Sequence, residues 1–239
     1  MVTVGDTLAA SAWAVATAGR RDDVVAAVAV HPTEVGELDG PDGEQRWRQL
    51  EALARDPRCV AVGETGLDFY WDRTTPERQL VWFRRHLELA HEVGKPVMIH
   101  DRQAHDDVLR TVLEVGVPAA GVVMHSFSGD ARFAEACLAE GFVLSFSGVA
   151  TFTNAPDVRE AAIRCPATSM VIETDAPFLT PHPFRGRPNS PEMLGWTARG
   201  VAALRGEDPA VLAAATTATA CRVFPVLSGS PNLRPDVDG

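Results

Sequence analysis

The stretch VVAAVAV, residues 24–30, carries no polar side chain at any position. A strand with one face in water alternates apolar and polar residues, whereas a strand that is covered on both faces is apolar throughout. The stretch GVVMH, residues 121–125, has the same character up to its final histidine. Both stretches therefore predict strands of a parallel sheet with helices packed over it.

Short apolar runs of this kind alternate along the chain with longer segments rich in Ala, Leu and Arg. The predicted strands lie at residues 2–4, 24–30, 59–63, 96–100, 121–125, 142–145 and 170–173. The predicted helices lie at residues 6–18, 43–55, 76–93, 104–115, 131–140, 191–204 and 209–223. Repeated strand-then-helix units predict an α/β fold, either a TIM-type (β/α) barrel or a doubly wound sheet.

The organisation of the chain is expected to be simple. No low-complexity linker divides its middle, which predicts one domain over residues 1–227. The stretch SGSPNLRPDVDG, residues 228–239, is rich in turn-forming residues and is expected to be a disordered tail. No segment approaches the ~20 consecutive apolar residues that span a bilayer, and the N-terminus shows no secretory signal. These features favour a cytoplasmic protein without a membrane partner.

The charge and the cysteines exclude several classes of protein. A net charge of −10 argues against a wide cationic surface that coats long nucleic acid. It is compatible with an enzyme that binds one phosphodiester at a metal ion.

The four cysteines are widely scattered and form no C-x-x-C pair. Buried, reduced thiols are therefore favoured over a zinc cluster or disulfides.

Four side chains that can bind metals stand at or just past the ends of predicted strands: Glu64, His100, His125 and Asp175. In a parallel barrel the carboxyl ends of the strands converge on one face, where active sites lie. Each residue alone also fits a structural role, as a hydrogen-bonded histidine, a cap or a turn former. Two imidazoles and two carboxylates on one face predict a site for Zn²⁺, Mn²⁺ or Mg²⁺.

Three further residues are candidates for substrate contacts. His31 ends the predicted strand in VAVHPTE, where a role in supporting a metal ligand, a substrate-facing role and a structural role are all open. Arg102 follows His100 by two positions, and Arg187 lies in the loop PHPFRGRPNSP. Guanidinium groups at the mouth of a barrel suit a substrate that carries phosphate. For each arginine the alternative is a solvated loop charge or a salt bridge.

The segments VGETGLDFY (62–70), PVMIHDRQAHDD (96–107), MHSFSG (124–129) and ETDAPFLTPHPFRGRPNSP (173–191) resemble successive motifs of the TatD family of metal-dependent deoxyribonucleases. AVHPTE (29–34) is similar to an earlier motif of that family. The matches follow the expected order over residues 1–225. The resemblance implies a TIM barrel of the amidohydrolase-like kind. It also implies hydrolysis of phosphodiester bonds in DNA, typically as a 3′-to-5′ exonuclease on single strands.

The resemblance also implies roles for individual residues. Glu64 would bridge two divalent metal ions, and His100 and His125 would complete one of the two sites. Asp175 would bind the other ion and act as general base for the attacking water, so that Asp175 and Glu64 are the expected catalytic residues. Arg102 and Arg187 are the expected phosphate contacts, and DNA is the expected partner.

One motif of the family has no counterpart here. The family opens with a strand that bears His-x-His, whereas residues 1–18, MVTVGDTLAASAWAVATA, resemble the second strand and its helix. We therefore expect a barrel that lacks its first strand and helix, or about 35–45 residues. Loss of the two imidazoles predicts that one of the two metal ions is retained and that nuclease activity is low. Unpaired sheet edges predict poor solubility.

Two alternative functions stay open. An amidohydrolase-type C–N hydrolase would use a similar barrel and similar metal ligands, although the arginines near the strand ends favour phosphate over a neutral amide. A non-catalytic scaffold is the other alternative, supported by the absent His-x-His.

Overall fold

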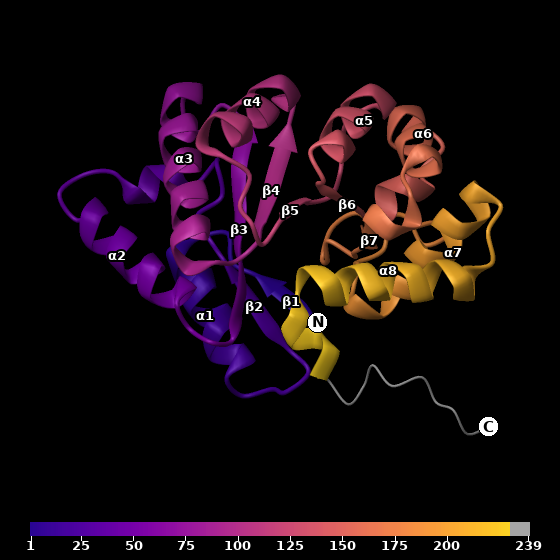
Figure 1. Cartoon of the computed structure of the whole chain (residues 1–239), viewed down its shortest axis with the longest axis horizontal. Helices are drawn as coiled ribbons and strands as arrows, with labels where there is room; N and C mark the ends of the chain where they lie inside the picture. The colour runs from indigo at the N-terminus through magenta and orange to yellow at the C-terminus, as the bar shows by residue number, and fades with distance from the viewer. Residues whose placement is uncertain (230–239) are drawn as a thin grey trace. The chain divides into compact units, whose positions relative to one another are not determined.

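The computed structural model describes residues 1–229 and divides into two compact units (Figure 1). The first unit comprises Met1–Val122 and the C-terminal segment from Val223, and the second comprises Val123–Arg222. The single domain expected over residues 1–227 stays a prediction. The tail expected at residues 228–239 lies outside the described residues from residue 230 onward.

The first unit is built on a parallel sheet in which each strand pairs with the next along the chain. Its strands are β1 (Val2–Val4), β2 (Val25–Val28), β3 (Cys59–Asp68) and β4 (Val97–Arg102). Its helices are α1 (Leu8–Ala18), the short 3₁₀ turn η1 (Val35–Leu38), α2 (Gly43–Ala54), α3 (Pro76–Val93), α4 (His105–Val115) and the C-terminal 3₁₀ turn η5 (Pro225–Gly229). Helix α1 packs on β1 and β2, α2 and α3 pack on β3, and α4 packs on β3 and β4.

The second unit repeats this pattern of parallel strands and covering helices. Its strands are β5 (Val122–Met124, beginning at the boundary), β6 (Val143–Phe146) and β7 (Met170–Ile172). Its helical elements are α5 (Ala131–Ala139), η2 (Gly148–Thr151), α6 (Pro156–Arg164), η3 (Ala167–Ser169), η4 (Pro191–Met193), α7 (Leu194–Arg205) and α8 (Pro209–Val223). Helix α5 packs on β6 and α7 packs on β7, with α6 between α5 and α7.

The stretch VVAAVAV behaves as its sequence predicts. Every residue from Val24 to Val30 is buried, at 5% exposure or less. Both faces of β2 can be buried without loss of backbone hydrogen bonds, because the strand pairs with β1 on one side and with β3 on the other. The apolar run therefore reports a strand inside a covered sheet.

Each of the seven predicted strands overlaps an observed strand, but two boundaries and one helix need correction. β3 runs to Asp68, not to residue 63, so Glu64 lies inside the strand. The register between β3 and β4 shifts between Val62 and Thr65, an irregularity that the apolar pattern does not encode. β4 runs to Arg102, so His100 also lies within its strand. Helix α6 was missed, although Pro156 occupies the first helical turn as helix starts favour.

No helix of the described residues is both long and apolar enough to cross a membrane. Cys59, Cys137 and Cys165 are buried, and Cys221 is half-buried. Burial raises the pKa of the Cys59 and Cys165 thiols, which keeps them protonated and unreactive.

His86 lies on α3 and connects this helix to the backbone that follows β2. The side chain is fully buried, its Nδ1 lies 2.7 Å from the Trp82 carbonyl oxygen, and its Nε2 accepts the Val30 N–H at 3.2 Å. These two bonds fit one neutral tautomer, with the proton on Nδ1. Burial lowers the pKa of His86 from 6.5 to about 4. The folded state therefore keeps His86 neutral where the unfolded chain would protonate it.

Because of His86, the free energy of unfolding is expected to decrease as the pH is lowered. Below pH 6.5 the unfolded state binds a proton that folded His86 refuses, until the folded pKa of about 4 is reached. The loss across that window is roughly 3 kcal/mol. His86→Gln, whose amide can satisfy both partners, should remove this part of the slope. Urea unfolding followed from pH 7 to pH 4 measures it, and equal slopes for the two proteins would contradict the assignment.

Candidate metal centre

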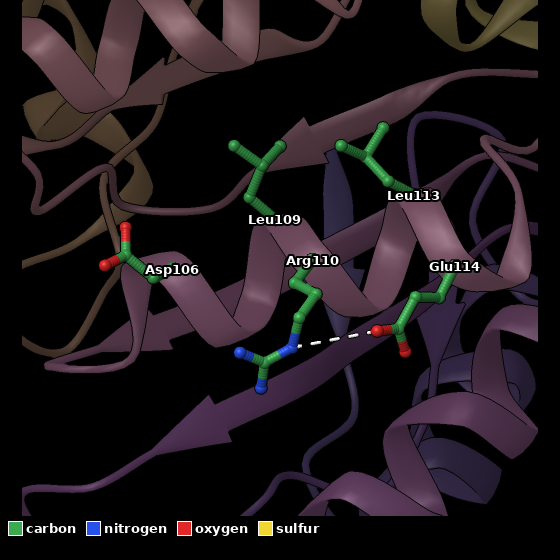
Figure 2. Close-up of a pocket in the computed structure, with 5 residues that line it drawn as sticks. All are labelled: Asp106, Leu109, Arg110, Leu113 and Glu114. Atoms are coloured by element: carbon green, nitrogen blue, oxygen red, sulfur yellow. Dashed lines mark ion pairs between the residues drawn. The ribbon is translucent and has the colours of Figure 1, made fainter.

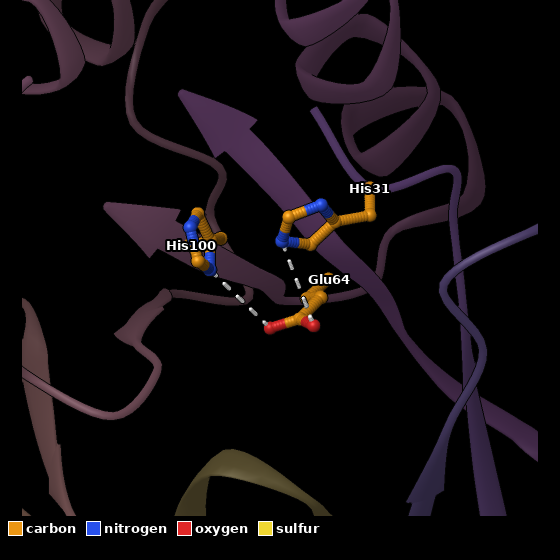
Figure 3. Close-up of side chains that lie close together, drawn as sticks. All are labelled: His31, Glu64 and His100. Carbon is orange, nitrogen blue, oxygen red and sulfur yellow. Dashed lines mark ion pairs between the residues drawn. The ribbon is translucent and has the colours of Figure 1, made fainter. Parts of the chain in front are cut away.

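His31, Glu64 and His100 form the first group of possible metal ligands, in the first unit (Figure 3). One ligand atom from each lies within 4.8 Å of the others. Glu64 projects from β3 and His100 from β4, while His31 follows β2 by three residues. The His31 Nε2 atom is 4.0 Å from one Glu64 oxygen, and the His100 Nδ1 atom is 3.8 Å from the other. Three successive strands thus bring these side chains together.

Asp68 orients His100. Its Oδ2 lies 2.9 Å from His100 Nε2, while its Oδ1 accepts the backbone N–H groups of Tyr70 and Trp71, both at 3.0 Å. Burial alone would raise the pKa of Asp68, but the bonds from His100, Trp71 and Tyr70 outweigh it and lower the pKa below its ordinary value of 3.8. An ionised Asp68 accepts the proton of Nε2, which directs the Nδ1 lone pair towards Glu64. Carboxylates orient metal-binding histidines in this way.

His31 is held neutral. Burial, followed by repulsion from His100, lowers its pKa from 6.5 to about 4, although Glu64, Asp68 and Asp6 act in the other direction. Its Nδ1 lies 2.8 Å from the Thr33 hydroxyl, which in turn donates to Glu34 at 3.2 Å. The Thr33 backbone N–H also donates to Nδ1, at 3.2 Å, and Nε2 is the imidazole nitrogen that faces Glu64. A neutral imidazole is the form that binds a metal ion.

The second group, in the second unit, consists of His125, Glu173 and Asp175. His125 directly follows β5, and Glu173 directly follows β7. The His125 Nδ1 atom lies 3.0 Å from Glu173 Oε2, which also accepts a hydrogen bond from the Ser145 hydroxyl. The other imidazole nitrogen, Nε2, is 3.6 Å from an Asp175 oxygen. Glu173 therefore orients His125 as Asp68 orients His100.

The donor sets of both groups fit a divalent metal ion. Nitrogen and carboxylate ligands about 2.1 Å from a tetrahedral ion lie about 3.4 Å apart, close to the 3.6–4.0 Å separations found here. These separations exceed hydrogen-bond length. Within the described part of the chain, Glu173 Oε1 is buried and has no hydrogen-bond partner. Such an orphaned carboxylate oxygen is costly unless a cation or proton reaches it.

Backbone strain is concentrated beside these ligands. Among residues 1–229, the non-glycine residues with positive φ are Gln103, Ser126, Asp175 and Leu179. Asp175 has φ 56°, Ser126 follows His125 directly, and Gln103 follows Arg102. Non-glycine residues rarely adopt this region, and those that do cluster at functional sites. The strain marks the same strand ends that the ligands occupy.

The structure brings the predicted ligands together in pairs. Glu64 meets His100 in one unit, and His125 meets Asp175 in the other. His31, expected as a substrate contact, stands among the possible ligands instead. Sequence reasoning missed Glu173, whose signal was its place two residues before Asp175. The roles of all these residues, and the number of metal ions, stay predictions.

The two predicted phosphate contacts are exposed and lie against aromatic rings. The guanidinium carbon of Arg102 is 3.9 Å from the ring centroid of Tyr70, and that of Arg187 is 5.6 Å from that of Phe184. Arg185, two residues before Arg187, lies 3.9 Å over Phe152. These contacts hold the charged groups in place without neutralising them.

A surface hollow of about 460 Å³ lies elsewhere, along the outer side of α4 (Figure 2). Its lining residues are Asp106, Leu109, Arg110, Leu113 and Glu114. All come from one helix, Leu113 is 44% exposed, and Arg110 pairs with Glu114. The hollow contains none of the candidate ligands, so it does not compete with them as the reactive centre.

Solved structures with similar backbones identify the fold. An uncharacterized amidohydrolase from Saccharomyces cerevisiae superposes with a TM-score of 0.75 at 17% identity, over 93% of this chain and 88% of that one. The crystal structure of YjjV, a TatD homolog from Escherichia coli, gives a TM-score of 0.86 at 29% identity, over 94% and 85%. The chain thus has the TIM-type α/β fold of the amidohydrolase-like kind.

The sequence narrows this class to one family. Residues 1–225 match the family model for TatD related DNase. An uncharacterized metal-dependent hydrolase TatD from Mycobacterium tuberculosis is 42% identical over 94% of this chain and 85% of that protein. A protein from Erwinia billingiae named 3′-5′ ssDNA/RNA exonuclease TatD is 39% identical over 82% and 75%. The chain belongs to the family of TatD-related DNases.

Proposed function

We propose that the chain hydrolyses phosphodiester bonds in DNA and removes nucleotides from the 3′ end of single strands, as a cytoplasmic enzyme. The observation that carries this proposal is the placement of histidine nitrogens 3.6–4.0 Å from carboxylate oxygens in both ligand groups. The name of the Erwinia billingiae relative supports the substrate class. The burial of Cys59 and Cys165 as thiols is in keeping with a reducing compartment.

Glu64 and His100 in the first unit, and His125 and Asp175 in the second, are proposed to hold divalent metal, with His31 and Glu173 as further donors in their own units. When bound, such ions stabilise negative charge on phosphoryl oxygens and make water a stronger nucleophile. Asp68 and Glu173 keep His100 and His125 in one tautomer each. Asp175 is proposed to accept the proton of the attacking water at a side-chain oxygen. Its side chain is 28% exposed, which gives that water access.

The substrate must approach an acidic protein. A chain with net charge −10 repels a polyanion unless local cations offset that field. Arg102 and Arg187 are proposed to supply this charge, each by holding a phosphate group of the substrate. Guanidinium groups match phosphate oxygens with paired N–H donors, and lysine would not replace them fully.

The proposal is tested on the full chain with a single-stranded oligodeoxynucleotide labelled at its 5′ end. After metal removal by a chelator, addition of Mg²⁺, Mn²⁺ or Zn²⁺ is expected to restore shortening from the 3′ end. The expected gain is at least about a hundredfold in rate, because the metal contributes several kcal/mol to the transition state. Gel analysis of the shortened products measures it.

Two controls separate the competing functions. A small amide substrate should stay intact under the same conditions, since its cleavage would favour the C–N hydrolase. Calorimetry should show that the ion binds. If the ion binds and none of the three metals gives shortened products, the nuclease proposal is wrong and a non-catalytic scaffold is favoured.

A further inference from the structure

Two adjacent aromatic side chains and one arginine lie exposed close to the first ligand group. Tyr70 and Trp71 follow β3 and are 49% and 50% exposed. Their rings meet edge to face, with centroids 4.9 Å apart. The guanidinium carbon of Arg102, the last residue of β4, is 3.9 Å from the Tyr70 ring centroid and 5.7 Å from that of Trp71. These three residues are called the aromatic corner below.

Aromatic rings, and not a carboxylate, hold Arg102. Within the described part of the chain no carboxylate lies at ion-pair distance from it, whereas Arg55 and Arg85 each face a glutamate. A guanidinium over a ring face is attracted to the ring yet keeps its N–H donors at its edge. The protein has ten more negative than positive charges, yet the Arg102 guanidinium faces aromatic rings and keeps its N–H donors available to bind an anionic ligand.

The aromatic corner is fixed in position relative to the ligand group. Gly66 pairs with His100 and Asp68 pairs with Arg102 in the register of β3 and β4. His100 and Arg102 are two residues apart in one strand, so their side chains leave from the same face of the sheet. One buried carboxylate, that of Asp68, bonds both the His100 ring and the N–H groups of Tyr70 and Trp71. A ligand on the corner is therefore held at a set distance from His100.

We propose that the aromatic corner binds one unpaired nucleobase by stacking it on Trp71, while Arg102 holds the adjoining phosphate. This inference rests on the proposed function and specifies its substrate. An exposed indole offers a flat apolar face that any base can cover, and base stacking on aromatics is tolerant of sequence. Bases in a duplex are already stacked on their neighbours, so the corner selects single-stranded nucleic acid. It also discriminates against phosphodiesters that carry no base.

Binding is measured on the full chain without metal ions, so that no cleavage occurs. The ligand is a short oligothymidylate with a 5′ fluorophore, and the signal is its fluorescence anisotropy. Trp71→Leu is expected to weaken binding about tenfold, and Trp71→Phe, which keeps a ring, far less. The wild type should bind an abasic oligomer of equal length about as weakly as Trp71→Leu binds oligothymidylate.

Trp13→Leu is the matched control, because Trp13 is 60% exposed on α1 and outside the aromatic corner. Its affinity should equal that of the wild type. Equal binding of the two oligomers by the wild type, or equal affinity of Trp71→Leu and wild type, overturns the proposal. Adding metal ions then separates the two ideas. If both oligomers are cleaved at the same rate, the nuclease proposal stands and the aromatic corner does not bind the base. If the protein binds the two oligomers with different affinity but cleaves neither, the aromatic corner stands and the nuclease proposal is wrong.

Discussion

Replacing Glu64 by glutamine is expected to lower metal-dependent cleavage of single-stranded DNA about a thousandfold. Glu64 is the carboxylate between two imidazoles, 4.0 Å from His31 and 3.8 Å from His100. Glutamine keeps the shape but removes the negative charge, and a neutral amide is a poor ligand beside two histidines. Several kcal/mol of transition-state stabilisation are lost with the ion. Oligonucleotide cleavage and calorimetric metal titration on the same preparation measure both effects.

The matched control is Glu44→Gln. Glu44 lies on α2, is 64% exposed and pairs with Arg85, so its loss should change cleavage less than twofold. Glu64→Gln should not lower the free energy of unfolding, since removing a largely buried charge relieves desolvation. Retention of cleavage within tenfold of the wild type, with unchanged metal affinity, would rule Glu64 out as a ligand.

Gly66→Ala is expected to cost about 4 kcal/mol in the free energy of unfolding, by two effects. Gly66 has φ 140°, where a side chain strains the backbone by about 1–3 kcal/mol. A Cβ atom there would also lie 2.0 Å from the carbonyl oxygen of His100, so β4 must move, and overpacking of this kind costs about 1–3 kcal/mol. The same movement displaces His100 from Glu64. Urea unfolding measures the loss.

Gly94→Ala is the control for this change. Gly94 also has positive φ, 62°, at the end of α3, but nothing lies within 4 Å of its missing Cβ. Only the backbone penalty of about 1 kcal/mol applies. If the two alanine variants lose the same stability, the close approach of β3 and β4 at Gly66 is not the cause.

Most of the fold could be predicted from local patterns. Each of the seven predicted strands contains a short, mostly apolar run, and a run that is apolar throughout indicates burial on both faces. Helix α6 was missed because its segment is short and polar, with buried positions only at Val158, Ala161 and Ala162. That spacing is helical, and with Pro156 before it the helix could have been found.

Some of the candidate ligands could be predicted from the sequence, and others could not. Glu64, His100 and His125 could be predicted because each closes an apolar run, and the resemblance to a family named their roles. His31 as a possible ligand could not be predicted, and Glu173 was missed although it stands two residues before Asp175. Whether a side chain points at a neighbour depends on strand register and on the conformation of the loops. The separation of two residues in the sequence does not reveal either.

The sequence by itself determined the order of strands and helices, the chemistry of the ligands and the family, because these depend on residue type and local period. Only the tertiary structure decided which donors meet. It placed His31 4.0 Å from Glu64, gave Asp68 both His100 and the turn at Tyr70 and Trp71, and set Arg102 on an aromatic ring. Apart from the bonds between Asp68 and its adjoining turn, those contacts join residues more than thirty positions apart, and the pairing of neighbouring strands brings such residues within a few ångströms.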